Sequence, residues 1–339
     1  MHFMSAIYRL DETEKRKLHF LYRHSGIENR YSVIDDFSQS CSEWDFIPQC
    51  NNMPFPQLED RMKVYAKEAA PLSVRAIKDC IEGHITAGEI THLITVSCTG
   101  MSAPGLDLQV AEAMQLPPSV FRTSVNFMGC YAAVHALKLA KLVCDTSPAA
   151  NVVIVATELC TIHFQESYTA DNAAAGLLFA DGCAAVLVSG NSSKAGTGLS
   201  LNGFYSQVAY RGKNDMAWQL SSKGFLMTLS GYVPDIVEED IAQLVNNALQ
   251  HYGLQKKDVK HWCVHPGGKK ILEVIEKQLL LGKDALRSSR RILASHGNMS
   301  SPTVLFVLKD MLEQKHTRGN IMGIAFGPGL TMETFIASA

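Results

Sequence analysis

The sequence lacks long apolar runs, paired cysteine spacings and an excess of charge of either sign. No window reaches the roughly 18 unbroken apolar residues of a membrane span, and the N-terminal stretch is charged early, without the apolar core of a signal peptide. With 31 basic and 33 acidic residues, the formal net charge is -2. This balance gives no electrostatic reason to expect nucleic acid or an anionic membrane as a partner.

The nine cysteines are scattered along the chain, and several lie in apolar segments. They show no CxxC or cysteine–histidine spacing that would indicate a zinc site. An odd number of cysteines in a large core suits a reducing cytoplasm better than a disulfide framework. We therefore expect a cytoplasmic protein without a metal site.

The 339 residues suggest two core units of roughly 150 residues each. Short apolar runs separated by helical patterns predict an α/β protein with strands buried on both faces. The predicted strands are 92–98, 152–157, 184–189, 261–264, 321–326 and 334–337. The predicted helices are 11–20, 61–81, 106–114, 132–143, 236–251, 269–280 and 303–312.

Two segments, 126–141 and 295–311, each run from a glycine-containing polar turn into a helix with small residues in its first turn. This similarity indicates two topologically similar halves, which we place at residues 1–200 and 201–339. The stretch 192–223 is richer in glycine, serine and asparagine. It is predicted to be a connecting region that faces the substrate.

Cys130 follows Gly129 at the predicted start of a helix, in the small-residue segment GCYAA. A thiol at a helix N-terminus lies near the positive end of the dipole, which favours the thiolate that attacks thioesters. Gly129 allows the close approach that a nucleophile at a strand-to-helix turn needs. The alternative is a small core cysteine that fills space between helix and sheet.

Two polar residues in the second half also precede predicted helices. His265 ends a predicted strand and leads into a Pro-Gly-Gly loop, a place where parallel-sheet proteins position working residues. Asn298 comes before the helix at 303–312, where an amide donor aimed at a carbonyl oxygen would stabilise an enolate or oxyanion. The alternatives are a core or capping histidine and an asparagine N-cap.

Taken together, these motifs resemble those of the type III polyketide synthases, the chalcone-synthase-like branch of the thiolase superfamily. The resemblance extends from about Lys17 to the C-terminus. It is carried by TGMSAPGLDLQ at 99–109, NFMGCYAA at 126–133, LLFADGCAA at 177–185, WCVHPGGKKILE at 262–273, GNMSS at 297–301 and FGPGLTMET at 326–334. It implies a thiolase-like, five-layer αβαβα fold built from two similar halves.

The resemblance also implies an acyltransferase in which Cys130 takes a starter from acyl-CoA and holds the growing chain. His265 would pair with the Cys130 thiolate. With Asn298 it would hold the thioester carbonyl of malonyl-CoA while decarboxylation forms an enolate, whose charge two fixed donors in a dry site stabilise. No metal, nicotinamide or flavin is needed, so we expect no cofactor besides the CoA thioester substrates.

The resemblance also implies which residues line the substrate cavity. Phe179 matches a phenylalanine between the CoA tunnel and the cavity, and Met227 is expected at the partner gate position, where a flexible thioether admits long chains. The other residues implied are Cys98, Cys160, Trp218, Gly327, Pro328 and Gly329. Because several of them depart from the chalcone-synthase pattern, we expect an alkylpyrone or alkylresorcinol made from a fatty acyl starter.

For the CoA phosphates the resemblance implies Lys17, with Arg23 as a substitute because Phe20 and His24 stand at usually basic positions. The glycines expected at the CoA site are Gly267 and Gly268.

Members of this family are homodimers, so we expect a homodimer. Ala103 stands where the family usually places a methionine that enters the partner's cavity, and Met101 lies nearby. The opening strand of the family has no counterpart before Met1, so we expect either a shortened chain or a first sheet without that edge.

Two other enzyme classes fit the same triad. A ketoacyl-ACP synthase III-like enzyme shares the cysteine, histidine and asparagine, but its histidine motif typically reads HQAN and it lacks the GPG ending. A Cys-His-Asn hydrolase is the second class. A non-catalytic ligand-binding relative is the remaining alternative, against which the intact triad argues.

Overall fold

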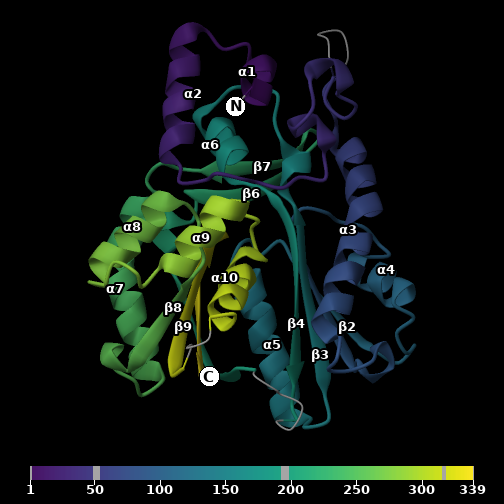
Figure 1. Cartoon of the computed structure of the whole chain (residues 1–339), viewed down its shortest axis with the longest axis vertical. Helices are drawn as coiled ribbons and strands as arrows, with labels where there is room; N and C mark the ends of the chain where they lie inside the picture. Colours follow the sequence, from purple (N-terminus) through teal and green to yellow (C-terminus); the bar gives the residue numbers. More distant parts are fainter. Residues whose placement is uncertain (1, 49–53, 192–197, 315–317, 339) are drawn as a thin grey trace.

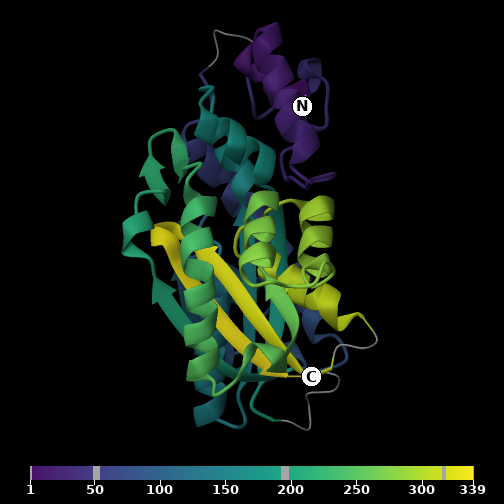
Figure 2. The same ribbon diagram turned by 90° about the vertical axis from the view of Figure 1, so that its left-hand side faces the viewer.

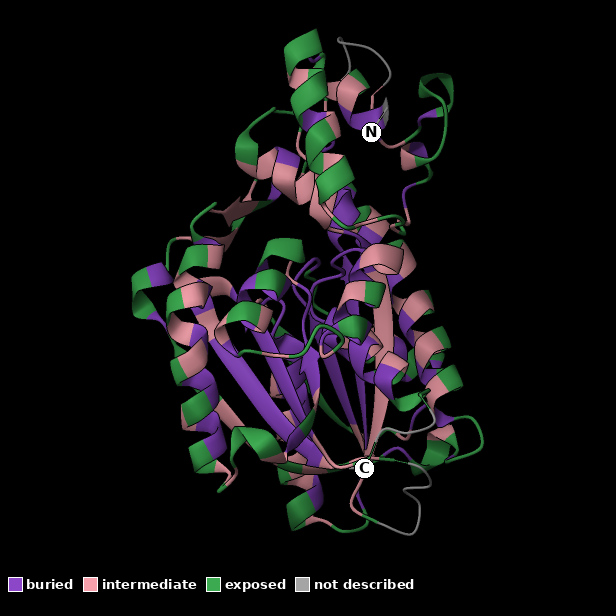
Figure 3. Ribbon diagram, turned by 60° about the vertical axis from the view of Figure 1, so that its left-hand side comes forward, coloured by how far each residue is buried: buried purple, intermediate pink, exposed green. Residues whose placement is uncertain are grey.

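The computed structural model describes residues 2–48, 54–191, 198–314 and 318–338. Two four-stranded sheets lie side by side with helices between them and on both outer faces (Figure 1). The central strands of both sheets and the inward helix faces are buried, whereas the outer helices expose one face to solvent (Figure 3). No helix in these described ranges combines the length and apolar character needed to cross a membrane.

The first sheet has the order β2-β1-β3-β4. Strand β1 (His92–Ser97) runs parallel to β2 (Phe121–Asn126) and β3 (Asn151–Leu159), while β4 (Asp181–Ser189) is antiparallel to β3. All nine residues of β3 are buried, as its apolar sequence predicts for a central strand covered on both faces. Strand β2 was not predicted, because five of its six residues are exposed and mostly polar.

The second sheet has the order β5-β10-β9-β8 (Figure 2). It consists of β5 (Ser200–Val208), β8 (Val259–Val264), β9 (Asn320–Gly327) and β10 (Thr331–Ser338). Strands β8 and β9 are parallel, and β10 is antiparallel to both of its neighbours.

The predicted connecting region at 192–223 contains two strands that were not expected, although Met216 and Trp218 within it line the cavity described below. Residues 200–208 form β5, and β6 (Met216–Ser221) pairs with β7 (Gly224–Leu229) in a hairpin. Residues 192–197 lie outside the described residues. Strand β5 escaped prediction because glycine and serine interrupt its apolar pattern, while pairing with β10 supplies the missing support.

The helices form three layers around the two sheets. Helices α3 (Leu58–Ile81) and α4 (Leu106–Ala113) cover the outer face of the first sheet. Helices α5 (Ala132–Thr146) and α10 (Thr303–Leu312) pack between the sheets. The outer layer of the second sheet contains α7 (Val233–His251) and α8 (Lys269–Gln278), with α9 (Arg287–His296) packing on α8, α10 and β8. This arrangement confirms the predicted five-layer αβαβα fold.

The remaining helices gather at one end of the molecule (Figure 1, Figure 2). They are α1 (His2–Tyr8), α2 (Glu12–His24) and α6 (Ala170–Leu178), which share a small apolar cluster. The N-cap of α2 is Asp11, whose carboxylate accepts from the Glu14 backbone N–H at 2.7 Å. Such a capping box satisfies two of the free N–H groups at a helix start.

The two halves repeat one topology. In each, two parallel strands are followed by an antiparallel one: β1, β3 and β4 in the first half, and β8, β9 and β10 in the second. A buried helix precedes the second strand of each set, α5 before β3 and α10 before β9. The division at residues 200 and 201 stays a prediction, and β5 spans it.

Candidate active site

Cys130, His265 and Asn298 line one cavity of about 380 Å³. Two of the three residues, Cys130 and Asn298, come from equivalent places in the two halves. Cys130 precedes α5, Asn298 precedes α10, and His265 directly follows β8. The sequence therefore identified three distant residues that the fold brings to one cavity between the sheets.

The turn that carries Cys130 depends on a glycine. Phe127 and Gly129 both have positive φ, 58° and 82°. A Cβ on Gly129 would lie 2.1 Å from the Cδ of Pro328, so only glycine fits this close approach. The loop after β9 is thus packed directly against the turn of the nucleophile.

The Cys130 thiol is buried, with 9% of the residue exposed, and it donates to the Ser300 hydroxyl at 3.5 Å. Burial raises the pKa of Cys130 to about 11, although hydrogen bonds from the side chains of Ser300 and Asn298 act in the opposite direction. Burial thus acts against the thiolate that the helix start was predicted to favour. Helix α5 begins only at Ala132, and desolvation outweighs the weak dipole effect.

His265 is held by its backbone, whose N–H donates to the Ile324 carbonyl at 2.8 Å. Its ring is 1% exposed, and neither ring nitrogen has a hydrogen-bond partner within the described part of the chain. Burial lowers the pKa of His265 to about 3. No hydrogen bond joins the His265 ring to the Cys130 thiol among the described residues, so the predicted pairing of His265 with the thiolate stays a prediction.

Asn298 is fixed by its backbone and its amide oxygen. Its N–H donates to Leu178, and its carbonyl accepts from Ala180, both at 2.9 Å. The side-chain Oδ1 accepts from the Ser300 N–H at 2.8 Å and from the Thr303 hydroxyl at 3.4 Å. With Oδ1 occupied, the amide group presents Nδ2 as a donor. Asn298 is not the N-cap of α10, since Pro302 holds that position.

Glu158 is a functional-site neighbour that sequence reasoning missed. It is fully buried at the end of β3, and one carboxylate oxygen accepts from the Cys98 N–H at 2.9 Å and the Thr99 hydroxyl at 2.8 Å. The other oxygen accepts from the Ser301 hydroxyl at 2.7 Å. A charged residue at the end of an otherwise apolar buried strand was the available signal.

Most of the predicted cavity residues lie where expected. Phe179, Met227, Cys98, Cys160, Trp218 and Pro328 line the cavity. Gly327 and Gly329 are not among its lining residues, which corrects that prediction. The Cα of Gly327 packs against Tyr131, where a Cβ would lie 2.5 Å from the ring, and Gly329 supplies a turn with φ of 72°.

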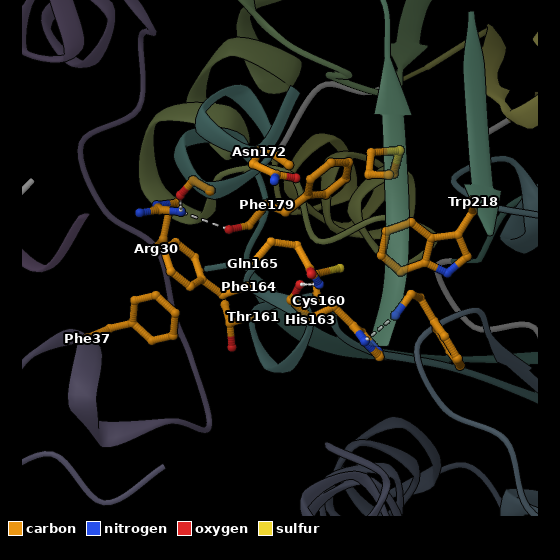
Figure 4. Close-up of a pocket in the computed structure, with 14 residues that line it drawn as sticks. Arg30, Phe37, Cys160, Thr161, His163, Phe164, Gln165, Asn172, Phe179 and Trp218 are labelled. Atoms are coloured by element: carbon orange, nitrogen blue, oxygen red, sulfur yellow. Dashed lines mark hydrogen bonds between the residues drawn. The ribbon is translucent and has the colours of Figure 1, made fainter. Parts of the chain in front are cut away.

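Trp218 forms a wall of the cavity together with Met227, its cross-strand partner in the β6–β7 hairpin. The indole N–H donates to the Cys98 carbonyl at 2.6 Å, and the ring packs edge-on against His163 at 5.6 Å. Behind this wall is a smaller cavity of about 40 Å³, which shares Cys160, Phe179, Trp218 and Met227 with the larger one (Figure 4). Arg30 closes it and donates to the Phe179 carbonyl at 2.9 Å (Figure 4).

Only two of the four residues predicted to bind CoA line the cavity. Gly267 and Gly268 line the cavity. Lys17 and Arg23 are exposed on α2 and are not among the lining residues, so no contact with the cavity supports their predicted role. The basic side chains that do line it are His24, Lys269 and Lys270, together with His265.

Two family models match the chain. "Chalcone and stilbene synthases, N-terminal domain" matches residues 3–192, and "Chalcone and stilbene synthases, C-terminal domain" matches residues 205–339. The chain belongs to the chalcone and stilbene synthase family. It is therefore a type III polyketide synthase, an acyltransferase that acts as a condensing enzyme, and the family implies CoA thioester substrates. The match sets aside the alternatives of a ketoacyl-ACP synthase III-like enzyme and a hydrolase.

Individual relatives agree with this assignment. The polyketide synthase is 30% identical over 331 residues to the "Alpha-pyrone synthesis polyketide synthase-like Pks18" of Mycobacterium tuberculosis, covering 96% of this chain and 82% of the relative. The structure of PKS-I from the brown alga Ectocarpus siliculosus has a TM-score of 0.88 at 28% identity, covering 96% and 90% of the two chains. The 1,3,6,8-tetrahydroxynaphthalene synthase of Streptomyces coelicolor A3(2) has a TM-score of 0.86 at 26% identity, covering 97% and 90%.

Replacing Glu158 with glutamine is predicted to change how stability depends on pH. Burial raises the pKa of Glu158 to about 7 from 4.5, so the folded state holds this proton more tightly than the unfolded state does. The contribution of protonated Glu158 to the free energy of unfolding is complete below about pH 4.5 and is lost as the pH rises through about 7. We expect the free energy of unfolding of the wild type, relative to Glu158→Gln, to fall over this range in urea titrations. Glu112→Gln, at an exposed site, is the control, and a pH-independent difference for Glu158→Gln would contradict the prediction.

Proposed function

We propose that Cys130 is the nucleophile of this polyketide synthase, with His265 as its base and Asn298 as the enolate donor. The observation that carries the proposal is the convergence of these three residues on one largely apolar cavity. His265 has two ring nitrogens without a partner among the described residues, and Asn298 has its amide oxygen already bound. Both are therefore available to a substrate.

In the loading step, His265 takes the proton of the Cys130 thiol. The sulfur attacks the starter thioester carbonyl, the carbon–sulfur bond to CoA breaks, and the CoA thiolate receives the proton from His265. Burial opposes separated charge, but a thiolate and an imidazolium formed side by side attract each other in the low-dielectric cavity.

In the extension step, the carboxylate of malonyl-CoA leaves as carbon dioxide, and its electron pair forms an enolate. The enolate oxygen accepts from Nδ2 of Asn298 and from the ring N–H of His265. Such fixed donors typically lower a barrier by about 3 kcal/mol each. The enolate carbon then attacks the carbonyl carbon of the Cys130 thioester, and a carbon–carbon bond forms. The carbon–sulfur bond to Cys130 breaks, the chain stays on the CoA that carried the malonyl group, and the released Cys130 thiolate takes a proton from water.

The cavity walls support an aliphatic starter and an alkylpyrone or alkylresorcinol product. Cys98, Cys160, Trp218 and Met227 contribute mainly apolar surface, and none of the described lining residues is acidic. A relative at 30% identity is named for alpha-pyrone synthesis, which favours lactone closure.

We also propose that the protein is cytoplasmic, because the described cysteines are all free thiols.

We also propose a homodimer in which two β2 strands face each other across a twofold axis. Strand β2 is the edge of the first sheet and has only β1 as a neighbour. Phe121 on this strand is 71% exposed, and Met101, in the same half of the chain, is 55% exposed. An exposed edge with apolar side chains is a template for pairing with another strand.

The nucleophile assignment is tested with Cys130→Ala. The variant is expected to make no extended product from acyl-CoA and malonyl-CoA, because the proposed carrier of the starter is removed. Products are measured by mass spectrometry. Cys144→Ala, a buried cysteine further along α5 and outside the cavity, is the matched control and should retain activity. Continued product formation by Cys130→Ala would remove the proposed role.

Met227→Phe is predicted to narrow the range of starters. The bulkier, stiffer ring would overlap a long chain, at a cost of roughly 1–3 kcal/mol, so kcat/KM for long acyl-CoA should fall about tenfold relative to short acyl-CoA. Leu226→Phe, the neighbouring and exposed position on β7, is the control. An unchanged chain-length profile for Met227→Phe would show that this side chain does not limit the starter.

The dimer is tested by sedimentation. We expect the wild type to sediment at twice the 37.2 kDa of the chain and Phe121→Glu to shift toward the monomer, because it would bury a charge at the paired edge. Leu142→Glu, at another exposed apolar residue, should leave the dimer intact. A monomeric wild type at micromolar concentration would contradict the proposal.

A further inference from the structure

Arg61 is a buried arginine that the proposed steps do not use. It lies in the first turns of α3 and is 0% exposed. Burial lowers the pKa of Arg61 to about 10, so the guanidinium still carries its charge at neutral pH. Charged side chains are rarely buried to this extent without a paired charge, yet the neighbouring Asp60 lies 3.6 Å from Lys63 instead. The described hydrogen bonds of Arg61 all go to backbone carbonyls.

The Arg61 guanidinium holds the segment that follows β3. Nη1 donates to the carbonyl of Ile162 and, at 2.9 Å, to that of Phe164. Nε donates at 3.1 Å to the Pro56 carbonyl, in the segment before α3. Arginine carries these donors on separate nitrogens of a rigid plane, whereas lysine carries all of its donors on one nitrogen. We therefore expect that a lysine cannot hold both segments at once.

His163 lies between these two carbonyls in sequence and contacts the β6–β7 hairpin. Its Nδ1 accepts from the Phe225 N–H at 3.1 Å, so Nε2 carries the proton that is donated to the Thr99 carbonyl at 2.7 Å. The ring also stacks on that of Phe225, with centroids 4.4 Å apart. Trp218 packs edge-on against the same imidazole ring (Figure 4). A shift of His163 would therefore move the hairpin.

The turn of the hairpin rests directly on Arg61. Gly224 has a φ of 106°, and a Cβ there would lie 2.7 Å from Cδ of Arg61. Next to this contact, the Leu58 N–H at the start of α3 donates to the Ser222 carbonyl at 2.8 Å. The hairpin forms a two-stranded sheet of its own, and such a hairpin is at best marginally stable alone. Its position therefore depends on these contacts with α3 and with the segment after β3.

We infer that Arg61 is a positioning residue that sets the range of starter lengths by fixing the hairpin wall of the catalytic cavity. Trp218 and Met227 are cross-strand partners on this hairpin, and both line the catalytic cavity and the smaller cavity behind it. A displaced hairpin would move these two side chains together, whereas the proposed catalytic residues lie on other elements. The inference rests on the proposed function, because the wall limits a starter only if the starter occupies this cavity.

The test compares starters of different length. Hexanoyl-CoA and tetradecanoyl-CoA are assayed, each with malonyl-CoA, using the wild type, Arg61→Lys and Arg75→Lys. Losing one hydrogen bond of typical net strength corresponds to a factor of about ten. We expect the ratio of kcat/KM for the long starter to that for the short one to rise about tenfold in Arg61→Lys, because Trp218 and Met227 can then retreat from the chain. Arg75→Lys, at an exposed position of the same helix, is the matched control and should leave the ratio unchanged.

The ratio does not depend on the amount of folded enzyme, so a purely structural loss would leave it unchanged. A second variant covers the case in which Arg61→Lys does not fold. Gly224→Ala keeps the Arg61 donors but pushes the hairpin away from the arginine stem, so it should change the same ratio by at least about threefold. Amide hydrogen exchange supplies a readout that needs no turnover: residues 216–229 should exchange faster in Arg61→Lys than in the wild type, with β3 and β9 unchanged.

An unchanged ratio in folded Arg61→Lys would overturn the inference, and so would equal losses of kcat/KM for both starters. If Arg61→Lys does not fold, an unchanged ratio in Gly224→Ala overturns it. A wild type that forms no product contradicts the proposed function instead. Faster exchange confined to the hairpin would then still support the positioning role of Arg61, and unchanged exchange would overturn it.

Discussion

The active site depends on a buried carboxylate that fastens one half of the chain to the other. Glu158, at the end of β3, accepts from Cys98 and Thr99 in the first half and from Ser301 in the second. Removing one partner would leave a buried polar group unsatisfied, which costs more than the bond itself contributes. Because Ser301 lies three residues after Asn298, this junction fixes the donor loop relative to the strand ends beside the nucleophile.

Burial then determines the chemistry that the site can perform. The same desolvation that raises the pKa of Cys130 to about 11 lowers that of His265 to about 3, so burial disfavours the charged form of both groups. A dry cavity makes each fixed donor worth more than in water, and this favours a reaction whose charge develops on one carbonyl oxygen. Asn298 is prepared for that role, since its amide oxygen is bound before any substrate arrives.

The sequence was most informative where local chemistry and global fold agree. The apolar run of β3 and the turns before α5 and α10 were predictable, because burial on both faces and small residues leave clear patterns. Strand β2 was missed because Val125 is its only buried residue, and Glu158 because its three partners come from distant segments. Lys17 was expected at the CoA site from its place in a motif, whereas the cavity opens instead beside Lys269, a relation that only packing determines.

The most direct test of this account is the location of the acyl group before extension begins. The protein is incubated with an acyl-CoA in the absence of malonyl-CoA, digested, and mapped by mass spectrometry. The account predicts one acyl adduct, on the peptide that contains Cys130, and none on Cys98 or Cys160 in the same cavity. An adduct on another cysteine, or product formation without any adduct on Cys130, would contradict it.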